Sequence, residues 1–210
     1  MLTLYYSKGS VSTAVAIALN EAGAAYDTVT VNFASGAQTK PDYHAINPKG
    51  RVPALVTERG VLTETSALLD YVAALYPDAG LVPDDPFQAA QMRSLMTYLA
   101  STWHVNHAMG GRGARWATQQ SSFDDLKSKV TENISANCRY VEDEALQGPF
   151  VVGAQFTLAD AYLFTALSWL PSDGVRIAQY PRLQAFQRRM LNRPSVQKAL
   201  ADGIFAGAEE

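Results

Sequence analysis

The sequence predicts a two-domain protein of the α/β plus all-α class, in which an α/β domain is followed by an all-helical domain. Three observations support this prediction. Residues 2–6 and 26–33 are rich in aromatic and β-branched residues, as strands are, and an alanine-rich run between them favours a helix. Residues 77–86 contain three prolines, three aspartates and one glycine, a composition typical of a linker. After this segment the apolar residues follow the spacing of helices.

The elements of the first domain are expected in the order strand, helix, strand, short helix, strand, strand, helix (βαβαββα), which is the order of a thioredoxin-like domain. A right-handed crossover makes the first two strands parallel, and a hairpin adds an antiparallel edge. Gly23 ends the first helix. The expected strands are residues 2–6, 26–33, 52–57 and 61–63, and the expected longer helices are residues 12–19 and 65–76.

The second domain is expected to be built from helices alone. These are residues 87–110, 122–146, 158–169, 180–191 and 195–201. We therefore place the first domain at residues 1–77, the linker at residues 78–86 and the helical domain at residues 87–210. Thr157 and Asp160 have the spacing of a capping box, in which each polar side chain bonds the other's backbone N–H, and we expect them to serve folding and not chemistry.

Composition and charge argue against several classes of protein. The chain is 48% hydrophobic and 18% charged, as globular proteins are. Its net charge of −3, with no basic cluster, argues against nucleic acid as a partner. No signal peptide is recognisable, and no apolar run approaches the roughly 18 residues of a membrane span, so we expect a cytoplasmic protein with no membrane partner. The single cysteine, Cys138, permits no intramolecular disulfide, and no metal site is expected.

Two neighbouring segments carry the strongest local signal. They are residues 47–55 (Asn-Pro-Lys-Gly-Arg-Val-Pro-Ala-Leu) and residues 62–68 (Leu-Thr-Glu-Thr-Ser-Ala-Leu). Together they predict a turn, a strand that opens near Pro53, a second strand, and a helix that starts in a polar cluster. A helix N-terminus beside a proline-fixed loop suits an anionic, peptide-like ligand, because backbone N–H groups and the helix dipole favour negative charge there.

With these segments, further motifs make nearly the whole chain resemble the bacterial glutathione S-transferases, most closely the beta class. The motifs occur in order and at the family's spacing: residues 4–6 (Leu-Tyr-Tyr), 17–19 (Ile-Ala-Leu), 47–55, 63–64 (Thr-Glu), 103–104 (Trp-His) and 153–164 (Gly-Ala-Gln-Phe-Thr-Leu-Ala-Asp-Ala-Tyr-Leu-Phe). The resemblance implies an enzyme that binds glutathione, its co-substrate, in the first domain. It implies that the glutathione thiolate is conjugated to a small hydrophobic electrophile held by the second domain, and that the protein is a homodimer.

For glutathione, the resemblance implies a site made from both segments. It implies a cis peptide bond before Pro53, with the Val52 backbone pairing with the cysteinyl backbone of glutathione, and it includes Arg51 from the same motif. Thr65 would bind the γ-glutamyl carboxylate, and Glu64 would accept from the γ-glutamyl ammonium group. The alternatives are an edge strand that begins with proline and an ordinary helix start with an acidic residue.

The sulfur-activating position departs from the beta class. That class usually carries a cysteine at the first turn of the first helix, where this chain has Val11, so no mixed disulfide can form there. Ser12 is the first candidate to donate a hydrogen bond to the thiolate, and Ser10 and Tyr6 are neighbours with usable hydroxyl groups. Either serine could instead cap the helix. By resemblance, His104 reaches the site from the second domain and donates to the thiolate or the product.

Three further residues are candidates for the second-substrate pocket. His107 lies one helical turn after His104, and Arg112 lies in a glycine-rich stretch (residues 110–116) that could bind a carboxylate or phosphate of the second substrate. By resemblance, Trp169 faces the cleft and forms a wall of the apolar pocket. The alternatives are a plain helix–helix turn for the stretch that contains Arg112 and an ordinary core position for Trp169.

Two other functions remain open on the sequence. A glutathione-binding module with weak or no catalysis is suggested by Val11 in place of the family cysteine, and by Gly36 near the position of a glutathione-contacting lysine. A related glutathione-dependent peroxidase or cleavage enzyme is the third reading. The maleylacetoacetate isomerase type is less favoured, because its serine- and cysteine-rich N-terminal signature is absent.

Overall fold

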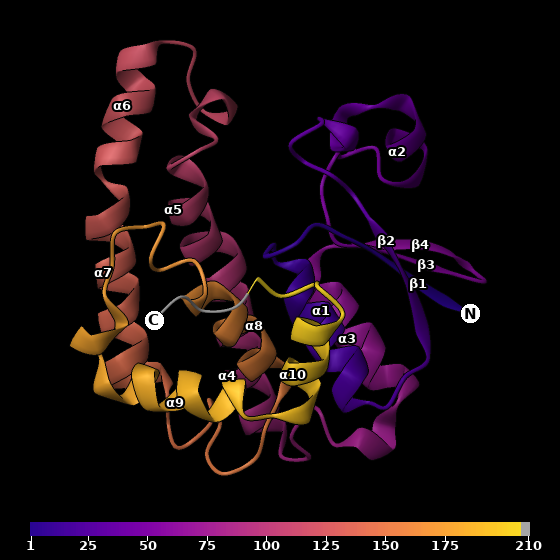
Figure 1. Cartoon of the computed structure of the whole chain (residues 1–210). Helices are drawn as coiled ribbons and strands as arrows, with labels where there is room; N and C mark the ends of the chain where they lie inside the picture. Colours follow the sequence, from indigo (N-terminus) through magenta and orange to yellow (C-terminus); the bar gives the residue numbers. More distant parts are fainter. Residues whose placement is uncertain (207–210) are drawn as a thin grey trace.

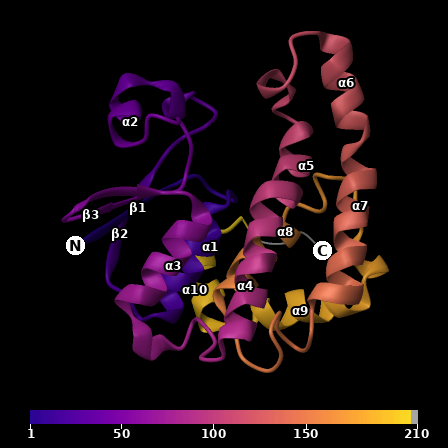
Figure 2. The same ribbon diagram turned by 180° about the vertical axis from the view of Figure 1, so that it is seen from behind.

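The computed structural model describes residues 1–206. The protein has an α/β part and a helical part, which lie side by side (Figure 1). The view from behind shows the same arrangement, with α4 (Pro86–Tyr98), α5 (His104–Met109), α6 (Gln120–Ser128) and α7 (Val130–Tyr140) running upright beside the sheet and α9 (Pro181–Leu191) lying across their lower end (Figure 2). None of the helices within residues 1–206 has the length and apolar character that a membrane span requires.

A mixed four-stranded sheet forms the centre of the thioredoxin-like N-terminal domain. The strand order is β2-β1-β3-β4. β1 (Leu2–Tyr6) pairs in parallel with β2 (Tyr26–Thr30) and antiparallel with β3 (Ala54–Thr57). The hairpin partner of β3 is β4 (Gly60–Thr63) at the sheet edge. The predicted parallel pair and antiparallel edge are therefore both confirmed.

Helices cover both faces of this sheet (Figure 1 and Figure 2). α1 (Ser12–Glu21) and α3 (Thr65–Leu75) lie on one face, whereas the short η1 (Ala37–Thr39) and α2 (Pro41–Ile46) lie on the other. In α1 every residue from 12 to 19 is excluded from solvent. This helix is therefore buried on all its sides, which accounts for the alanine-rich, uncharged sequence of residues 12–19.

The helical domain follows a short 3₁₀ turn, η2 (Pro77–Ala79). Two of its longer helices end in π-helical turns, at η3 and η5. The elements are α4 (Pro86–Tyr98), η3 (Leu99–Trp103), α5 (His104–Met109), η4 (Gly113–Arg115), α6 (Gln120–Ser128), α7 (Val130–Tyr140), η5 (Val141–Ala145), α8 (Leu158–Leu167), η6 (Ile177–Gln179), α9 (Pro181–Leu191) and α10 (Pro194–Ala201).

The predicted element order is confirmed, but several boundaries differ. The second strand was expected to run to residue 33 and ends at Thr30, because the Asn32 side chain accepts from the N–H groups of Ala34 and Ser35 and closes a turn. The third strand starts two residues later than expected, after Pro53, which has no N–H to give to the ladder. The single helix expected at residues 122–146 is divided into α6, α7 and η5.

The most buried helix of the second domain is α8, all of whose residues are buried. The predicted capping box is present at its start: the Thr157 N–H and Oγ1 both donate to Asp160 Oδ2, at 2.7 and 2.9 Å. Asp160 Oδ1 also accepts from the Val151 N–H at 2.7 Å, so this carboxylate ties the preceding loop to the helix. One fully buried side chain thereby satisfies three donors that would otherwise lack partners.

The two domains are joined mainly through α1, which packs against α8 and α10. Glu21 at the end of α1 forms two parallel hydrogen bonds with Arg193, both of 2.7 Å, and accepts a third from Ser195. Burial raises the pKa of Glu21, but these hydrogen bonds outweigh burial and hold its pKa below the usual value. The carboxylate is therefore a fixed, charged link between the domains.

Replacing Asp160 by alanine is expected to destabilise the protein strongly. The Asp160→Ala variant leaves three buried donors without an acceptor, which should lower the free energy of unfolding by about 3 kcal/mol or more. For a chain of this length the thermal midpoint should fall by about 6 °C or more, as measured by calorimetry or circular dichroism. Asp84→Ala, which removes an exposed carboxylate from the inter-domain segment, is the matched control. An unchanged midpoint in Asp160→Ala would contradict the folding role.

Candidate active site

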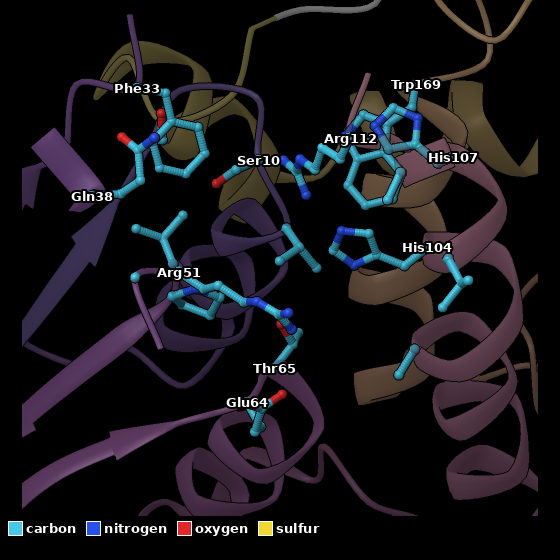
Figure 3. Close-up of a pocket in the computed structure, with 18 of the residues that line it drawn as sticks. Ser10, Phe33, Gln38, Arg51, Glu64, Thr65, His104, His107, Arg112 and Trp169 are labelled. Atoms are coloured by element: carbon cyan, nitrogen blue, oxygen red, sulfur yellow. The ribbon is translucent and has the colours of Figure 1, made fainter. Parts of the chain in front are cut away.

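A cleft of about 520 Å³ lies between the two domains, with residues of both along its walls (Figure 3). The N-terminal domain contributes the loop before α1, the segment before β3, and the start of α3. The helical domain contributes η3, α5, the connection to α6, and α8. The lining residues are Ser7, Lys8, Gly9, Ser10, Val11, Phe33, Gln38, Asn47, Gly50, Arg51, Val52, Pro53, Glu64, Thr65, Ala100, His104, Val105, His107, Ala108, Arg112, Arg115, Trp116, Tyr162 and Trp169.

The loop at residues 7–10 is held in place by the helical domain. The Gly9 N–H donates to the Ile204 carbonyl at 3.0 Å, and the indole Nε1–H of Trp169 donates to the Gly9 carbonyl at 2.9 Å. Gly9 has a φ of 68°, in the left-handed region where only glycine is free of strain. Both peptide groups of this glycine are thus bonded to distant parts of the chain, which positions the start of α1 at the cleft.

Of the three hydroxyl candidates on the first domain, only Ser10 lines the cleft. Its Oγ donates to Ser12 Oγ at 3.0 Å and accepts from the Ser12 N–H at 3.3 Å. Ser12, the first choice from sequence, is fully buried behind Ser10 as the first residue of α1, and Tyr6 is buried within β1. Ser12 and Tyr6 are therefore not placed to touch a ligand in the cleft, because both side chains lie in the core of the first domain.

The residues expected to hold glutathione do come together. The Val52–Pro53 peptide bond is cis, as the resemblance implied, and both residues line the cleft with Arg51. Glu64 and Thr65, at the start of α3, lie on the same wall, and the Arg51 side chain extends toward Thr65 (Figure 3). The free N–H groups of the first turn of α3 therefore face the same space as the side chains of Arg51, Glu64 and Thr65, which can bind polar groups of a ligand.

Glu64 has an unusual backbone conformation. Its φ of 74° is the only positive value at a non-glycine position among residues 1–206. Such a residue costs conformational free energy and occurs mostly at functional sites, where the surrounding structure maintains it. The carboxylate is bonded to Lys49 Nζ, which also donates to Thr63 Oγ1 at 2.7 Å. The Lys49 ammonium group therefore balances the charge of Glu64.

On the opposite wall, the three candidate residues with aromatic rings, His104, His107 and Trp169, lie against one another. The His107 and Trp169 rings are stacked, with centroids 4.5 Å apart, and the His104 and Trp169 centroids are 5.0 Å apart. The His107 Nδ1–H donates to the buried Asp173 Oδ1 at 2.8 Å. Because a carboxylate only accepts, this bond sets the tautomer and the orientation of the His107 ring.

His104 is held in its neutral form. Burial lowers the pKa of His104 to about 3, with further contributions from His107 and from the arginines Arg112, Arg115 and Arg51. At neutral pH the ring can therefore donate one hydrogen bond, but it adds no positive charge to the cleft. An imidazolium role for His104 is excluded by these surroundings.

Several lining residues were not found by sequence reasoning. Arg115 stands in the glycine-rich stretch already noted, but its spacing from Arg112 did not show that both would face the cleft. Gln38 lies in a segment that reads only as a polar loop, and its Oε1 is buried without a hydrogen-bond partner. Gly50 has a φ of 62°, and a Cβ there would come within 2.9 Å of the Gln38 carbonyl oxygen, so this glycine lets the two loops meet. No signal in the sequence could have revealed that contact.

Within the part of the chain that the structure describes, no group of three or more His, Cys, Asp and Glu side chains is arranged to hold a metal ion. The polar groups of the cleft are instead suited to an organic ligand with negatively charged ends: hydroxyl groups, a helix N-terminus and basic side chains.

Comparison with known proteins gives matches over both domains. Residues 1–74 match the family model for the N-terminal domain of glutathione S-transferase, and residues 114–203 match the model for its C-terminal domain. Glutathione S-transferase GstA of Escherichia coli O157:H7 is 31% identical over 207 residues, which cover 97% of this chain and 100% of the relative.

Solved structures give the same result. A glutathione transferase homologue from Sulfitobacter, with bound glutathione, is 56% identical, with a TM-score of 0.96 over 97% of this chain and 99% of that chain. A beta-class glutathione S-transferase from Sphingomonas chungbukensis is 32% identical, with a TM-score of 0.83 over 96% of this chain and 98% of that chain.

The neutral state of His104 can be tested by nuclear magnetic resonance. The chain has three histidines, and the His104 ring resonances, assigned with a His104→Gln variant, should not titrate between about pH 5 and 8. Because the folded pKa lies below the unfolded value of about 6.5, neutral His104 favours folding above pH 6.5. This contribution is lost as the pH falls from about 6.5 towards 3. A His104 midpoint near 6.5 would contradict this assignment.

Proposed function

The chain belongs to the glutathione S-transferase family, and from this premise we propose that it binds glutathione in the cleft and conjugates its sulfur to a small apolar electrophile. The observation that carries the proposal is that Ser10, Val52, Glu64 and Thr65 line one wall of a single cleft. A tripeptide lying along this wall would meet the Ser10 hydroxyl group at one point, the backbone of Val52 before β3 at another, and the N-terminus of α3 at its end.

We place the γ-glutamyl end of glutathione at α3. The N–H groups of the first turn and the Thr65 hydroxyl can donate to its carboxylate, and Glu64 can accept from its ammonium group. The Val52 backbone would pair with the cysteinyl backbone, as an added strand does. Arg51, which extends toward Thr65, can supply a further charge-assisted hydrogen bond to a carboxylate of the tripeptide (Figure 3).

In this arrangement the sulfur lies at Ser10. When a thiolate is bound, the Ser10 hydroxyl group turns its hydrogen to the sulfur, and the Ser12 hydroxyl donates to Ser10 Oγ in return, since each hydroxyl can both donate and accept. Ser12 is then a positioning residue and Ser10 the donor, while neutral His104 can give a second hydrogen bond from the other wall. Catalysis consists of stabilising the thiolate and holding it beside the electrophile. Val11 excludes a covalent bond between the protein and the sulfur at this position.

The comparisons favour a transferase over the binding-module and peroxidase or cleavage alternatives. By membership of this family we also propose a homodimer located in the cytoplasm. The division into residues 1–77, a linker at residues 78–86 and a helical domain from residue 87 remains a prediction, and limited proteolysis within residues 78–86 would test it.

The Thr65→Ala variant is expected to weaken glutathione binding, because it removes a charge-assisted hydrogen bond worth about 1.5–3 kcal/mol. The dissociation constant measured by calorimetry should rise roughly ten- to hundredfold. Thr28→Ala, the same substitution at an exposed position of β2, is the matched control and should bind like the wild type. Equal binding of glutathione by Thr65→Ala and the wild type would show that the γ-glutamyl carboxylate does not bind at Thr65. Wild-type protein that fails to bind glutathione would overturn the proposed function.

The Ser10→Ala variant is expected to shift the pH dependence of conjugation. Loss of a hydrogen bond to the thiolate should raise the pH of half-maximal rate with 1-chloro-2,4-dinitrobenzene by about 1–2 units, at nearly unchanged glutathione affinity. Ser12→Ala should give a smaller shift in the same direction, because it acts through Ser10. A larger shift in Ser12→Ala, or no shift in either variant, would contradict the assignment of Ser10 as the donor.

A further inference from the structure

Three arginines converge on the cleft from different sides. Arg51 stands on the glutathione wall before β3, whereas Arg112 and Arg115 stand on the helical wall, in the connection between α5 and α6. The Arg112 side chain reaches into the cleft from the side of His107 and Trp169 toward Ser10 (Figure 3). Arg112 is half-buried, and Arg51 and Arg115 are more exposed.

These arginines have no carboxylate partner within residues 1–206. No ion pair among the described residues includes any of the three, although other arginines, such as Arg193, are paired. In the described part of the chain, Glu64 is the only acidic residue that lines the cleft, and Lys49 already balances its charge. Burial lowers the pKa of Arg112 and of Arg115, and the neighbouring arginines lower both further. Like charges held this close favour an anion between them.

Glutathione alone does not balance this charge. Bound as a thiolate, it carries a net charge of about −2 at neutral pH. Among residues 1–206, four cationic side chains line the cleft, those of Lys8, Arg51, Arg112 and Arg115, against the single carboxylate of Glu64. A positive charge is therefore left over after glutathione is bound. Arg112 and Arg115 of the helical wall are not among the residues to which we assign the tripeptide, so they are available to a second ligand near Ser10.

Aromatic rings line the same wall next to these arginines. Trp169 is stacked with His107 and lies beside neutral His104, so the surface there is made of ring faces and edges. Planar rings pack well against such a surface. An apolar wall with guanidinium groups at its margin suits a ligand with an aromatic ring and a carboxylate.

We propose that the second substrate is an aromatic carboxylic acid with an electrophilic ring carbon, whose carboxylate binds Arg112 and Arg115 and whose ring packs on His104 and Trp169. This inference rests on the proposed function and narrows its substrate class. In the reaction, the glutathione thiolate forms a C–S bond to a ring carbon that carries a halide. The C–halogen bond breaks, halide leaves with the bonding electrons, and the thiol proton has already passed to solvent.

The test compares two substrates that differ in charge at one position, 4-chloro-3-nitrobenzoate and 4-chloro-3-nitrobenzamide. For each, kcat/KM is divided by the rate constant of the uncatalysed reaction with glutathione, which corrects for their different reactivity. The wild type should prefer the carboxylate by about tenfold or more, the size expected of a charge-assisted hydrogen bond. Arg112→Gln and Arg115→Gln should each lower this preference, and the double variant should abolish it.

Arg139→Gln is the matched control, since it removes one positive charge from an exposed site on α7, in the same domain but outside the cleft. It should keep the wild-type preference. Equal losses for both substrates in Arg112→Gln would assign this residue to the thiolate or to glutathione and overturn the proposal. A wild type that prefers the amide, or that does not discriminate, would overturn it as well, while leaving glutathione conjugation intact.

A binding measurement separates failure of this inference from failure of the proposed function. With the protein saturated by S-methylglutathione, 3-nitrobenzoate should bind more tightly than 3-nitrobenzamide by calorimetry, and the double arginine variant should lose the difference. This result does not require turnover. Equal affinities for the two compounds would refute an anionic second substrate. Failure to bind S-methylglutathione or glutathione at all would refute the proposed function, and with it this inference.

Discussion

Helix α1 is the constraint on which the rest of the structure depends. Its residues 12–19 are excluded from solvent because it packs on the sheet and α3 on one side and on α8 and α10 on the other. A helix buried on all sides cannot shift without opening both cores. The loop before it therefore has one position relative to both walls, and the hydrogen bonds of Gly9 to Ile204 and Trp169 fix that position within the cleft. The site is formed beside the helix that joins the cores of the two domains.

The sequence was sufficient for those parts of the fold that depend on local chemistry. The Pro53 loop, the helix start at Thr65 and the capping box of Thr157 and Asp160 are each recognisable from a few adjacent residues, and the structure has all three. The order of strands and helices follows from periodicity in the same way. Boundaries were less well predicted, because a single side chain such as Asn32 can end a strand through bonds that hydrophobic alternation does not reveal.

The site was predictable only in part, because its geometry depends on contacts between distant segments. The helix α1 begins at Ser12, as expected, but the sequence did not show that the Ser12 side chain lies in the core while Ser10, in the loop before the helix, lines the cleft. Arg115 and Gln38 enter the cleft through loops whose paths are set by tertiary contacts. By contrast Trp169, which could have been an ordinary core residue, does both: it is largely buried and it lines the cleft.

The charge of the cleft is opposite to that of the whole chain. The protein has a net charge of −3, yet among residues 1–206 cationic side chains outnumber carboxylates along the cleft, and the half-buried position of Arg112 strengthens its effect on a bound anion. Since His104 is neutral there, the positive potential comes from arginines, which keep their charge at every pH at which the protein is folded. Neutral His104 can then orient a bound thiolate through one hydrogen bond. The positive potential that favours the thiolate does not depend on the protonation state of this histidine. In the function we propose, the arginines supply the charge that favours a thiolate and Ser10 supplies a hydrogen bond to it, so no cysteine is required at the position of Val11.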